Sequence, residues 1–171
     1  MLSNKFQLPK DCSPMICELF DYWLSIHPNE GLPGRQHFDP LEIFGLSRNI
    51  WLLDVDKAPL RFRVRRIGAE LVECTNRDIT GRFLDEFYEN LEATEAGNHL
   101  VYSTEKGVPT YRRGMLISKS TKYYDMLERI ILPLATDGEN VDMLLNFTRY
   151  LDHKEQDRLR PVRVVPSAED A

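Results

Sequence analysis

The sequence predicts an α+β fold, in which a five-stranded antiparallel sheet has helices packed on one face and a helical extension at its N-terminus. The first observation is a helical apolar spacing over residues 91–106, ended by Gly107 and Pro109. The second is a run of three strand-like segments after that helix, close enough in sequence to form a meander. The third is a pair of strand-like segments before it, so that the order of elements favours one antiparallel sheet.

Residues 1–45 are expected to form a helix and a linker. Ser13 and Pro14 are a typical helix start, because serine caps the first turn and proline fits its first position. The apolar side chains that follow cover a wide arc: Met15, Ile16, Leu19, Phe20, Tyr22, Trp23 and Ile26. Such an arc suggests that the helix packs on its own sheet and on a second copy, with Ile16, Phe20 and Trp23 at the interface. Alternatively, the domain covers both sides of the helix itself.

The main domain is predicted to span residues 46–150. Ahead of it, residues 28–38 form a linker rich in proline and glycine, and Asp39-Pro40 is expected to start a short helix that ends at Gly45. The five strands are predicted at residues 50–55, 60–67, 108–118, 122–136 and 141–150.

One further helical segment and one turn complete the predicted domain. Residues 68–75 are typical of a short helix, and Asp137-Gly138 is a favoured hairpin turn between the last two strands. From Asp152 onward charged residues dominate, so residues 151–171 are expected to form a mostly solvated polar tail.

Composition limits the classes of partner. The chain has 171 residues, 42% of them hydrophobic, which is typical of one globular domain. No apolar run approaches the roughly 18 residues that a membrane span needs, and the N-terminus lacks a secretory signal. Three cysteines without metal-site spacing favour a reducing compartment, so we expect a cytoplasmic protein. A net charge of -5 favours a small molecule or a protein as partner over nucleic acid or a membrane.

Several short motifs give the chain a resemblance to the PAS superfamily. They are Phe62–Leu71 (FRVRRIGAEL), Asp78–Arg82 (DITGR), Glu128 with Leu132-Pro133-Leu134, Asp137-Gly138, Tyr22-Trp23 and Leu32-Pro33-Gly34-Arg35. In this order they look most like a family of short standalone bacterial PAS-type proteins. The resemblance implies a PAS-like sheet and a role in signal sensing or regulation. It implies no settled ligand, so the cofactor is unknown.

Two cofactors known from PAS relatives, flavin and haem, each require particular binding residues. Flavin photoreceptors carry a reactive cysteine just before an Arg-Phe-Leu motif, but here Ile79 and Thr80 stand before Gly81 and the motif, so no thiol adduct is expected. Noncovalent flavin stays open. Haem-binding relatives use a histidine of the long helix, where His99 is the candidate; it falls about 120° from the centre of the apolar stripe, which favours a solvent-exposed histidine. No metal site is expected.

A carboxylate on an apolar strand face is the strongest candidate for a binding residue. Glu128 shares strand parity with Tyr124 and Met126, so it needs a cationic partner, and Arg65 or Arg66 could approach it. We interpret it as an internal ion pair or a bulge that turns Glu128 outward; the functional alternative is a ligand anchor formed by these five residues. Six arginines could also form a basic strip for an anionic ligand, although a solvated sheet face is the favoured explanation: Arg61, Arg63, Arg65, Arg66, Arg112 and Arg113.

An enzymatic alternative rests on Asp54-Val55-Asp56 at the end of an apolar strand, where metal-dependent phosphoryl-transfer enzymes place two carboxylates. The motif of those enzymes has a threonine at the position of Ala58, and their folds are built on parallel sheets. No catalytic residues are therefore predicted. We expect a non-enzymatic regulatory module that binds a small molecule or a protein, signals through the N-terminal helix and forms homodimers. A pure protein-interaction adaptor is the second possibility.

Overall fold

The computed structural model describes residues 6–116 and 124–166, which form a six-stranded antiparallel sheet with the order β2-β1-β5-β4-β3-β6. The strands are β1 Ile50–Lys57, β2 Leu60–Ile67, β3 Thr110–Met115, β4 Met126–Leu134, β5 Met143–Leu151 and β6 Val162–Val164. The α+β, PAS-like fold and its five strands are confirmed, and β6 is added at one edge. Parts of the segments predicted at 108–118 and 122–136 lie outside the described residues.

Within the described residues, four α-helices and four 3₁₀ turns accompany the sheet. The helices are α1 Pro14–Ser25, α2 Ala69–Thr75, α3 Glu95–Lys106 and α4 His153–Arg158, and the 3₁₀ turns are η1 Arg35–His37, η2 Phe44–Leu46, η3 Leu84–Glu86 and η4 Leu91–Ala93. The predicted start at Ser13 and end at Gly107 are confirmed. A helix starting at Asp39-Pro40 is wrong, because those residues form turns that lead into η2.

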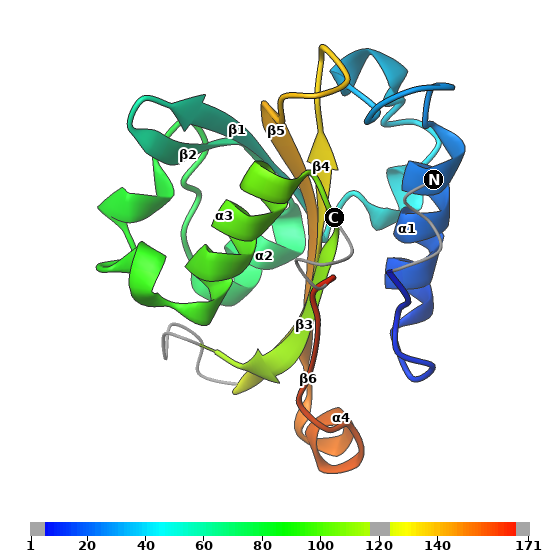
Figure 1. Cartoon of the computed structure of the whole chain (residues 1–171). Coiled ribbons are helices and arrows are strands. Elements are labelled where there is room, and N and C mark those ends of the chain that lie inside the picture. Colours follow the sequence, from blue (N-terminus) through cyan, green and yellow to red (C-terminus); the bar gives the residue numbers. More distant parts are fainter. Residues whose placement is uncertain (1–5, 117–123, 167–171) are drawn as a thin grey trace.

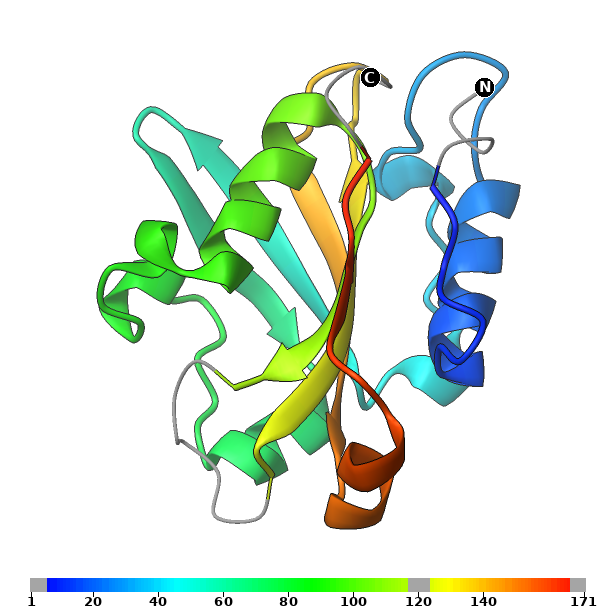
Figure 2. The ribbon, with the colours of Figure 1, turned by 60° about the horizontal axis from the view of Figure 1, so that its bottom comes forward.

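The helices lie on opposite faces of the sheet (Figures 1 and 2). We call the face covered by α1 the outer face, and the face covered by α2, α3 and the turns η3 and η4 the inner face. Because side chains alternate along a strand, consecutive residues of the central strands contact different layers. None of the helices in the described ranges combines the length and apolarity needed to cross a membrane.

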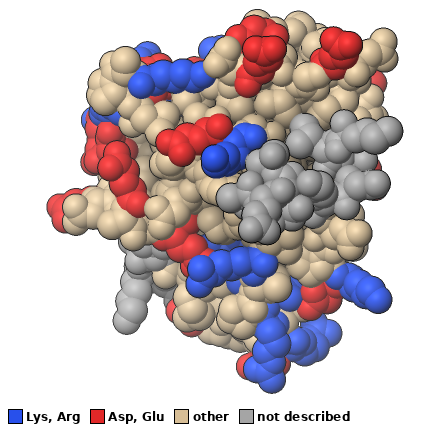
Figure 3. Space-filling model, viewed as in Figure 1, with Lys and Arg blue, Asp and Glu red and all other residues tan. Residues whose placement is uncertain are grey.

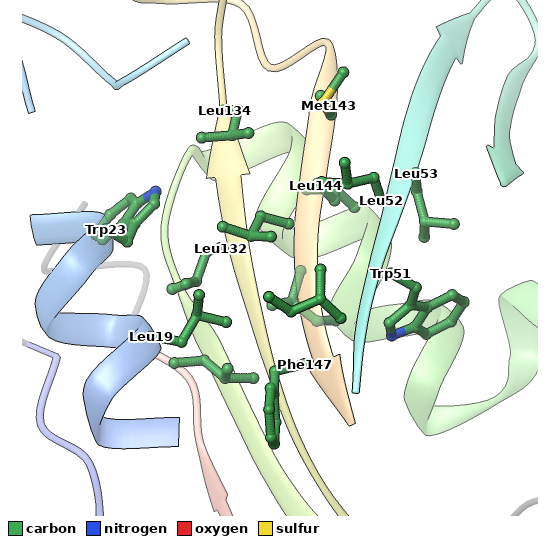
Figure 4. Close-up of a cluster of buried hydrophobic side chains, with 14 of the residues drawn as sticks. Leu19, Trp23, Trp51, Leu52, Leu53, Leu132, Leu134, Met143, Leu144 and Phe147 are labelled. Atoms are coloured by element: carbon green, nitrogen blue, oxygen red, sulfur yellow. The ribbon is translucent and has the colours of Figure 1, made fainter. Parts of the chain in front are cut away.

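The outer face is filled by α1. Leu19 and Trp23 point toward β4 and are buried (Figure 4), and Trp23 Nε1 donates a hydrogen bond to the Pro133 carbonyl oxygen at 3.0 Å. Ile16 and Phe20 are also buried within this layer. The structure therefore does not present Ile16, Phe20 and Trp23 to a second copy, because the sheet and the N-terminal segment, including Phe6, already cover them. A homodimer stays a prediction.

The C-terminal segment is attached to the sheet, although a mostly solvated tail was expected. The strand β6 pairs with β3, and Tyr102 Oη on α3 donates a hydrogen bond to the Pro166 carbonyl oxygen at 2.5 Å. This attachment covers the side of α3 that carries His99, since Glu95, His99 and Tyr102 share one side of the helix. His99 is consequently buried, and the expectation of a solvent-exposed histidine is wrong.

Candidate functional site

The inner face holds a small, partly open cavity next to a larger pocket that is open to a similar degree. The inner cavity has a volume of about 60 Å³, and its apolar and aromatic walls are Trp51, Leu84, Ala96, Leu100, Leu127 and Tyr150. The side pocket, of about 310 Å³, opens between β2, η3, η4 and α3. Tyr88 and Leu91 line both. Ligand pockets commonly measure about 300–1,000 Å³, so the inner cavity holds only part of a ligand unless Tyr88 or Leu91 moves.

Arg112 supplies the first charge of the inner cavity. It lies on β3, its side chain is 6% exposed, and its Nε lies 3.0 Å from Glu95 Oε2 on α3. Its Nη2 donates to the Met115 carbonyl oxygen at 2.5 Å. Within the described ranges, Nε and Nη1 have no hydrogen-bond partner of acceptable geometry. Arg112 is thus a buried cation with unused donors.

Arg129 supplies the second charge, directly opposite Arg112 on the neighbouring strand β4. Its Nε donates to Thr148 Oγ1 at 3.0 Å, and its guanidinium lies 5.1 Å from the Trp51 ring centroid. Burial, and to a smaller extent Arg112, lowers the pKa of Arg129 to about 10, so it remains charged at neutral pH. No carboxylate of the described chain forms an ion pair with it.

The neighbouring groups leave this charge only partly compensated. Glu95 is shared between Arg112 and Arg163, which also forms an ion pair with it. Burial lowers the pKa of His99 to about 4, so this histidine is neutral at pH 7 and adds no charge. Arg112, which is buried, and Arg129, which is partly buried, therefore lie opposite each other, and of the two only Arg112 has a carboxylate partner within the described residues, Glu95.

The outer face of the same strands carries a fully paired set of charges, which we call the Glu128 cluster: Glu128, Arg113, Arg149 and Tyr111. Glu128 is 0% exposed, and it accepts hydrogen bonds from Tyr111 Oη at 2.5 Å and Arg149 Nε at 3.0 Å. The Arg113 Nη1 atom lies 3.8 Å from Glu128 Oε1. Burial and the bond to Glu128 raise the pKa of Tyr111 well above its usual value.

The cluster shows that Glu128 forms an internal ion pair, the structural interpretation favoured by the sequence. The predicted partners are wrong, because Arg113 and Arg149 replace Arg65 and Arg66. Glu128 also faces α1, since the backbone N–H of Ser13 donates to it at 3.1 Å. It therefore does not contribute to a ligand site on the inner face.

A β-bulge explains where Arg65 and Arg66 lie. Leu53 pairs with Val64 and Leu52 pairs with Arg66, so Arg65 is the extra residue and the alternation of side chains is interrupted. Arg65 Nε consequently donates to Asp54 Oδ1 at 2.7 Å, and Arg66 is exposed beside Leu52 on the outer face. The prediction assumed that side chains alternate without interruption from Val64 to Arg66, and it therefore placed Arg66 on the wrong face of the sheet.

The other members of the predicted ligand anchor lie at the end of the sheet that carries the start of β4. Met126 is buried and pairs with Leu151. The Tyr124 ring centroid lies 5.6 Å from that of Tyr150, so Tyr124 lies beside one wall residue of the inner cavity without lining the cavity itself. The main charged groups of the cavity, Arg112 and Arg129, were missed as a pair. The sequence did contain a sign of this pair. The run of β4 is nearly continuously apolar, which predicts burial on both faces, so Arg129 could have been identified as a buried charge in the same way as Glu128.

The remaining candidate residues are paired or dispersed. Asp54 and Asp56 pair with Arg65 and Arg63 across the β1–β2 hairpin. In the part of the chain that the structure describes, no three metal-ligating side chains converge. Acidic and basic side chains both occur on the face shown in Figure 3, and basic ones gather toward the end that carries α4. That nucleic acid is not a partner stays a prediction.

Comparison with known proteins assigns this arrangement to a family. The family model PAS_5, described as a PAS domain, matches residues 12–147. The chain belongs to the PAS domain family. The match begins just before α1 and therefore includes the N-terminal helix with the sheet. The PAS fold suggests that the chain is a sensory or regulatory module.

Other comparisons add little to this PAS assignment. The chain is similar to a solved structure of a fungal LOV domain photoreceptor, with 12% identity, a TM-score of 0.44, and coverage of 79% of this chain and 91% of the other. So distant a likeness carries no argument about flavin or light. No curated protein matches the chain.

Proposed function

We propose that this PAS domain is a non-enzymatic sensory module of signal transduction. It binds a small molecule in the inner cavity and the side pocket, and it passes the signal through α1 to a protein partner or a second copy of the chain. Its three cysteines are unpaired, which fits the reducing cytoplasm where we expect it to act.

The observation that carries this proposal is the back-to-back arrangement of two charged pairs. Arg112 pairs in register with Arg129, and the next residues, Arg113 and Glu128, also pair in register. Strand alternation directs the first pair into the inner cavity and the second pair toward α1. A ligand that shifts β3 relative to β4 on the inner face therefore also shifts the Glu128 cluster on the outer face.

The Glu128 cluster is attached to both flanking segments. Glu128 accepts the backbone N–H of Ser13 at the start of α1. Arg113 donates to Asp11 Oδ2 at 2.8 Å and to the Arg160 carbonyl oxygen at 2.8 Å. These bonds give a ligand a physical means to favour one of two positions of α1, which is a population shift.

The proposal is tested by native mass spectrometry followed by hydrogen exchange. We expect freshly purified protein to retain a small molecule, and Ala96→Met to lose it because the longer side chain fills the inner cavity. Ala69→Met, at an exposed helical position, is the matched control and should retain the molecule. Exchange of the amides in residues 15–25 should differ severalfold between loaded and stripped protein. Equal exchange in the two forms would contradict signalling through α1.

A protein-interaction adaptor is the second candidate, because one part of the outer face is left open. Leu41 is 78% exposed and Phe44 is 71% exposed, beside a pocket of about 200 Å³ lined in part by Leu52 and Arg66. Exposed apolar side chains next to a cation suit a partner segment with apolar and acidic residues. If no small molecule is retained and Leu41→Ser with Phe44→Ser abolishes a partner interaction, the adaptor is favoured.

A further inference from the structure

The inner cavity carries more positive charge than its own residues neutralise. Resting on the ligand-binding function proposed above, we propose that it takes a small monoanionic carboxylate with an apolar or aromatic body, held between Arg112 and Arg129. Neutral and cationic molecules of the same shape are then excluded.

The charge of the buried groups indicates a monoanion. Arg112 and Arg129 contribute two positive charges, while Glu95 contributes one negative charge that exposed Arg163 shares from outside. Like charges in a poorly solvated space raise the free energy of the empty site. One added negative charge balances the buried guanidinium groups and Glu95. A dianion such as phosphate would place a second negative charge near Glu95, and the remaining cation there, Arg163, is exposed and screened by solvent.

The unused donors indicate a planar carboxylate. The Nη1 atom of Arg112 is buried and lacks a partner within the described residues, and the only hydrogen bond of Arg129 there uses its Nε. The terminal nitrogens of two guanidinium groups on adjacent strands can each donate to one carboxylate oxygen. Thr148 fixes Arg129 through Nε, so its terminal nitrogens remain available to a ligand.

The walls indicate that the rest of the ligand is apolar. Trp51, Leu100 and Leu127 line the same cavity as the two arginines. Tyr88 and Leu91 separate it from the side pocket, which is large enough for a ring or a short chain. The carboxylate therefore occupies the inner cavity, and the apolar body passes between Tyr88 and Leu91 into the side pocket.

Binding of matched probes tests the proposal. We would titrate dialysed full-length protein with benzoate, benzamide and benzylammonium at constant ionic strength, using calorimetry and tryptophan fluorescence. Benzoate is expected to bind saturably and at least tenfold more tightly than its neutral and cationic counterparts. Acetate and inorganic phosphate are the further arms: acetate should compete with benzoate, and phosphate should compete at least tenfold more weakly.

Variants of Arg129 test whether the binding depends on the guanidinium pair. Arg129→Met should weaken benzoate binding at least tenfold, Arg129→Lys should restore part of the affinity, and Arg63→Met at the exposed hairpin should leave it unchanged. Circular dichroism of each variant shows whether it folds. Equal binding of benzamide, unchanged affinity in Arg129→Met, or no saturable binding of benzoate and acetate would overturn the proposal. A retained neutral molecule would overturn it while leaving the sensory function intact; no retained molecule and no probe binding would defeat both.

Discussion

Two charged pairs lie back to back on β3 and β4, and they differ in how completely their charges are satisfied. On the outer face, Glu128 contacts Arg113, Arg149 and Tyr111. On the inner face, Arg112 shares Glu95 with Arg163 and keeps unused donors, and Arg129 has no carboxylate partner within the described residues. Burial is similar in the two places. The difference is that the outer pair is complete within the chain, whereas the inner pair is completed by a ligand in our proposal.

The two arrangements have different consequences for stability. A buried carboxylate with several donors stabilises the fold relative to any variant that removes it, because its partners are then left charged and unpaired. A buried cation without a counter-ion contributes little or is unfavourable until an anion binds. Substitution should therefore be costly on the outer face and nearly neutral on the inner face.

The largest effect is expected from Glu128→Gln. The substitution removes the negative charge that Arg113 and Arg149 face in a site with 0% exposure. We expect a loss of about 3–5 kcal/mol in the free energy of unfolding, as is typical when one partner of a buried ion pair is removed. Urea unfolding at pH 7, followed by circular dichroism, measures it.

The matched control for this loss is Asp56→Asn. Asp56 forms a single, half-exposed ion pair with Arg63 in the β1–β2 hairpin, so solvent screens it. Its removal should change the free energy of unfolding by less than about 1 kcal/mol. If Glu128→Gln cost no more than Asp56→Asn, the Glu128 cluster would not be the structural element described here.

An intermediate effect is expected from the pH dependence of stability through His99. Burial is the largest cause that lowers its pKa to about 4, with Arg112, Arg129 and Arg163 opposing protonation and Glu95 favouring it. The unfolded chain therefore binds the proton more tightly, and the stabilisation is complete above about pH 6.5 and lost as the pH falls toward 4. We expect a loss of about 2 kcal/mol in the free energy of unfolding between pH 7 and pH 5 from this group.

Two variants isolate this contribution from the titration of carboxylates. His99→Gln should flatten the pH dependence of the unfolding free energy between pH 7 and pH 5. His153→Gln, at an exposed position on α4, should leave the dependence unchanged. Identical slopes for the wild type and His99→Gln would show that His99 is not buried as described, and that the inner face is more solvated.

Patterns confined to one element predicted most of the fold. Alternation predicted the bounds of β2, proline at the first helical position predicted the start of α1 after Ser13, and glycine predicted the end of α3 at Gly107. The expected cap by serine is wrong, because the Ser13 side chain forms no hydrogen bond with the first turn of α1. The internal ion pair of Glu128 also followed from its position on an apolar strand. These features depend on residues that are neighbours in sequence.

Features that depend on distant residues were missed. The pairing of β6 with β3 places a charged segment against α3, and it buries His99, which helical periodicity alone placed off the apolar stripe. The bulge at Arg65 reverses the face of Arg66. Arg112 and Arg129 meet only because β3 and β4 pair in one particular register, which the sequence does not specify.

The smallest effect on stability is expected from Arg129→Met, which sharpens the contrast with Glu128. The variant loses the hydrogen bond to Thr148 and the contact with the Trp51 ring, but it also removes a desolvated charge next to Arg112. These terms oppose each other, and methionine fills a similar volume, so the free energy of unfolding should change by less than about 1 kcal/mol. Urea unfolding of dialysed protein at pH 7 measures this change. A loss approaching that of Glu128→Gln would mean that Arg129 has a structural anion within the chain, and that the inner pair is as complete as the outer one.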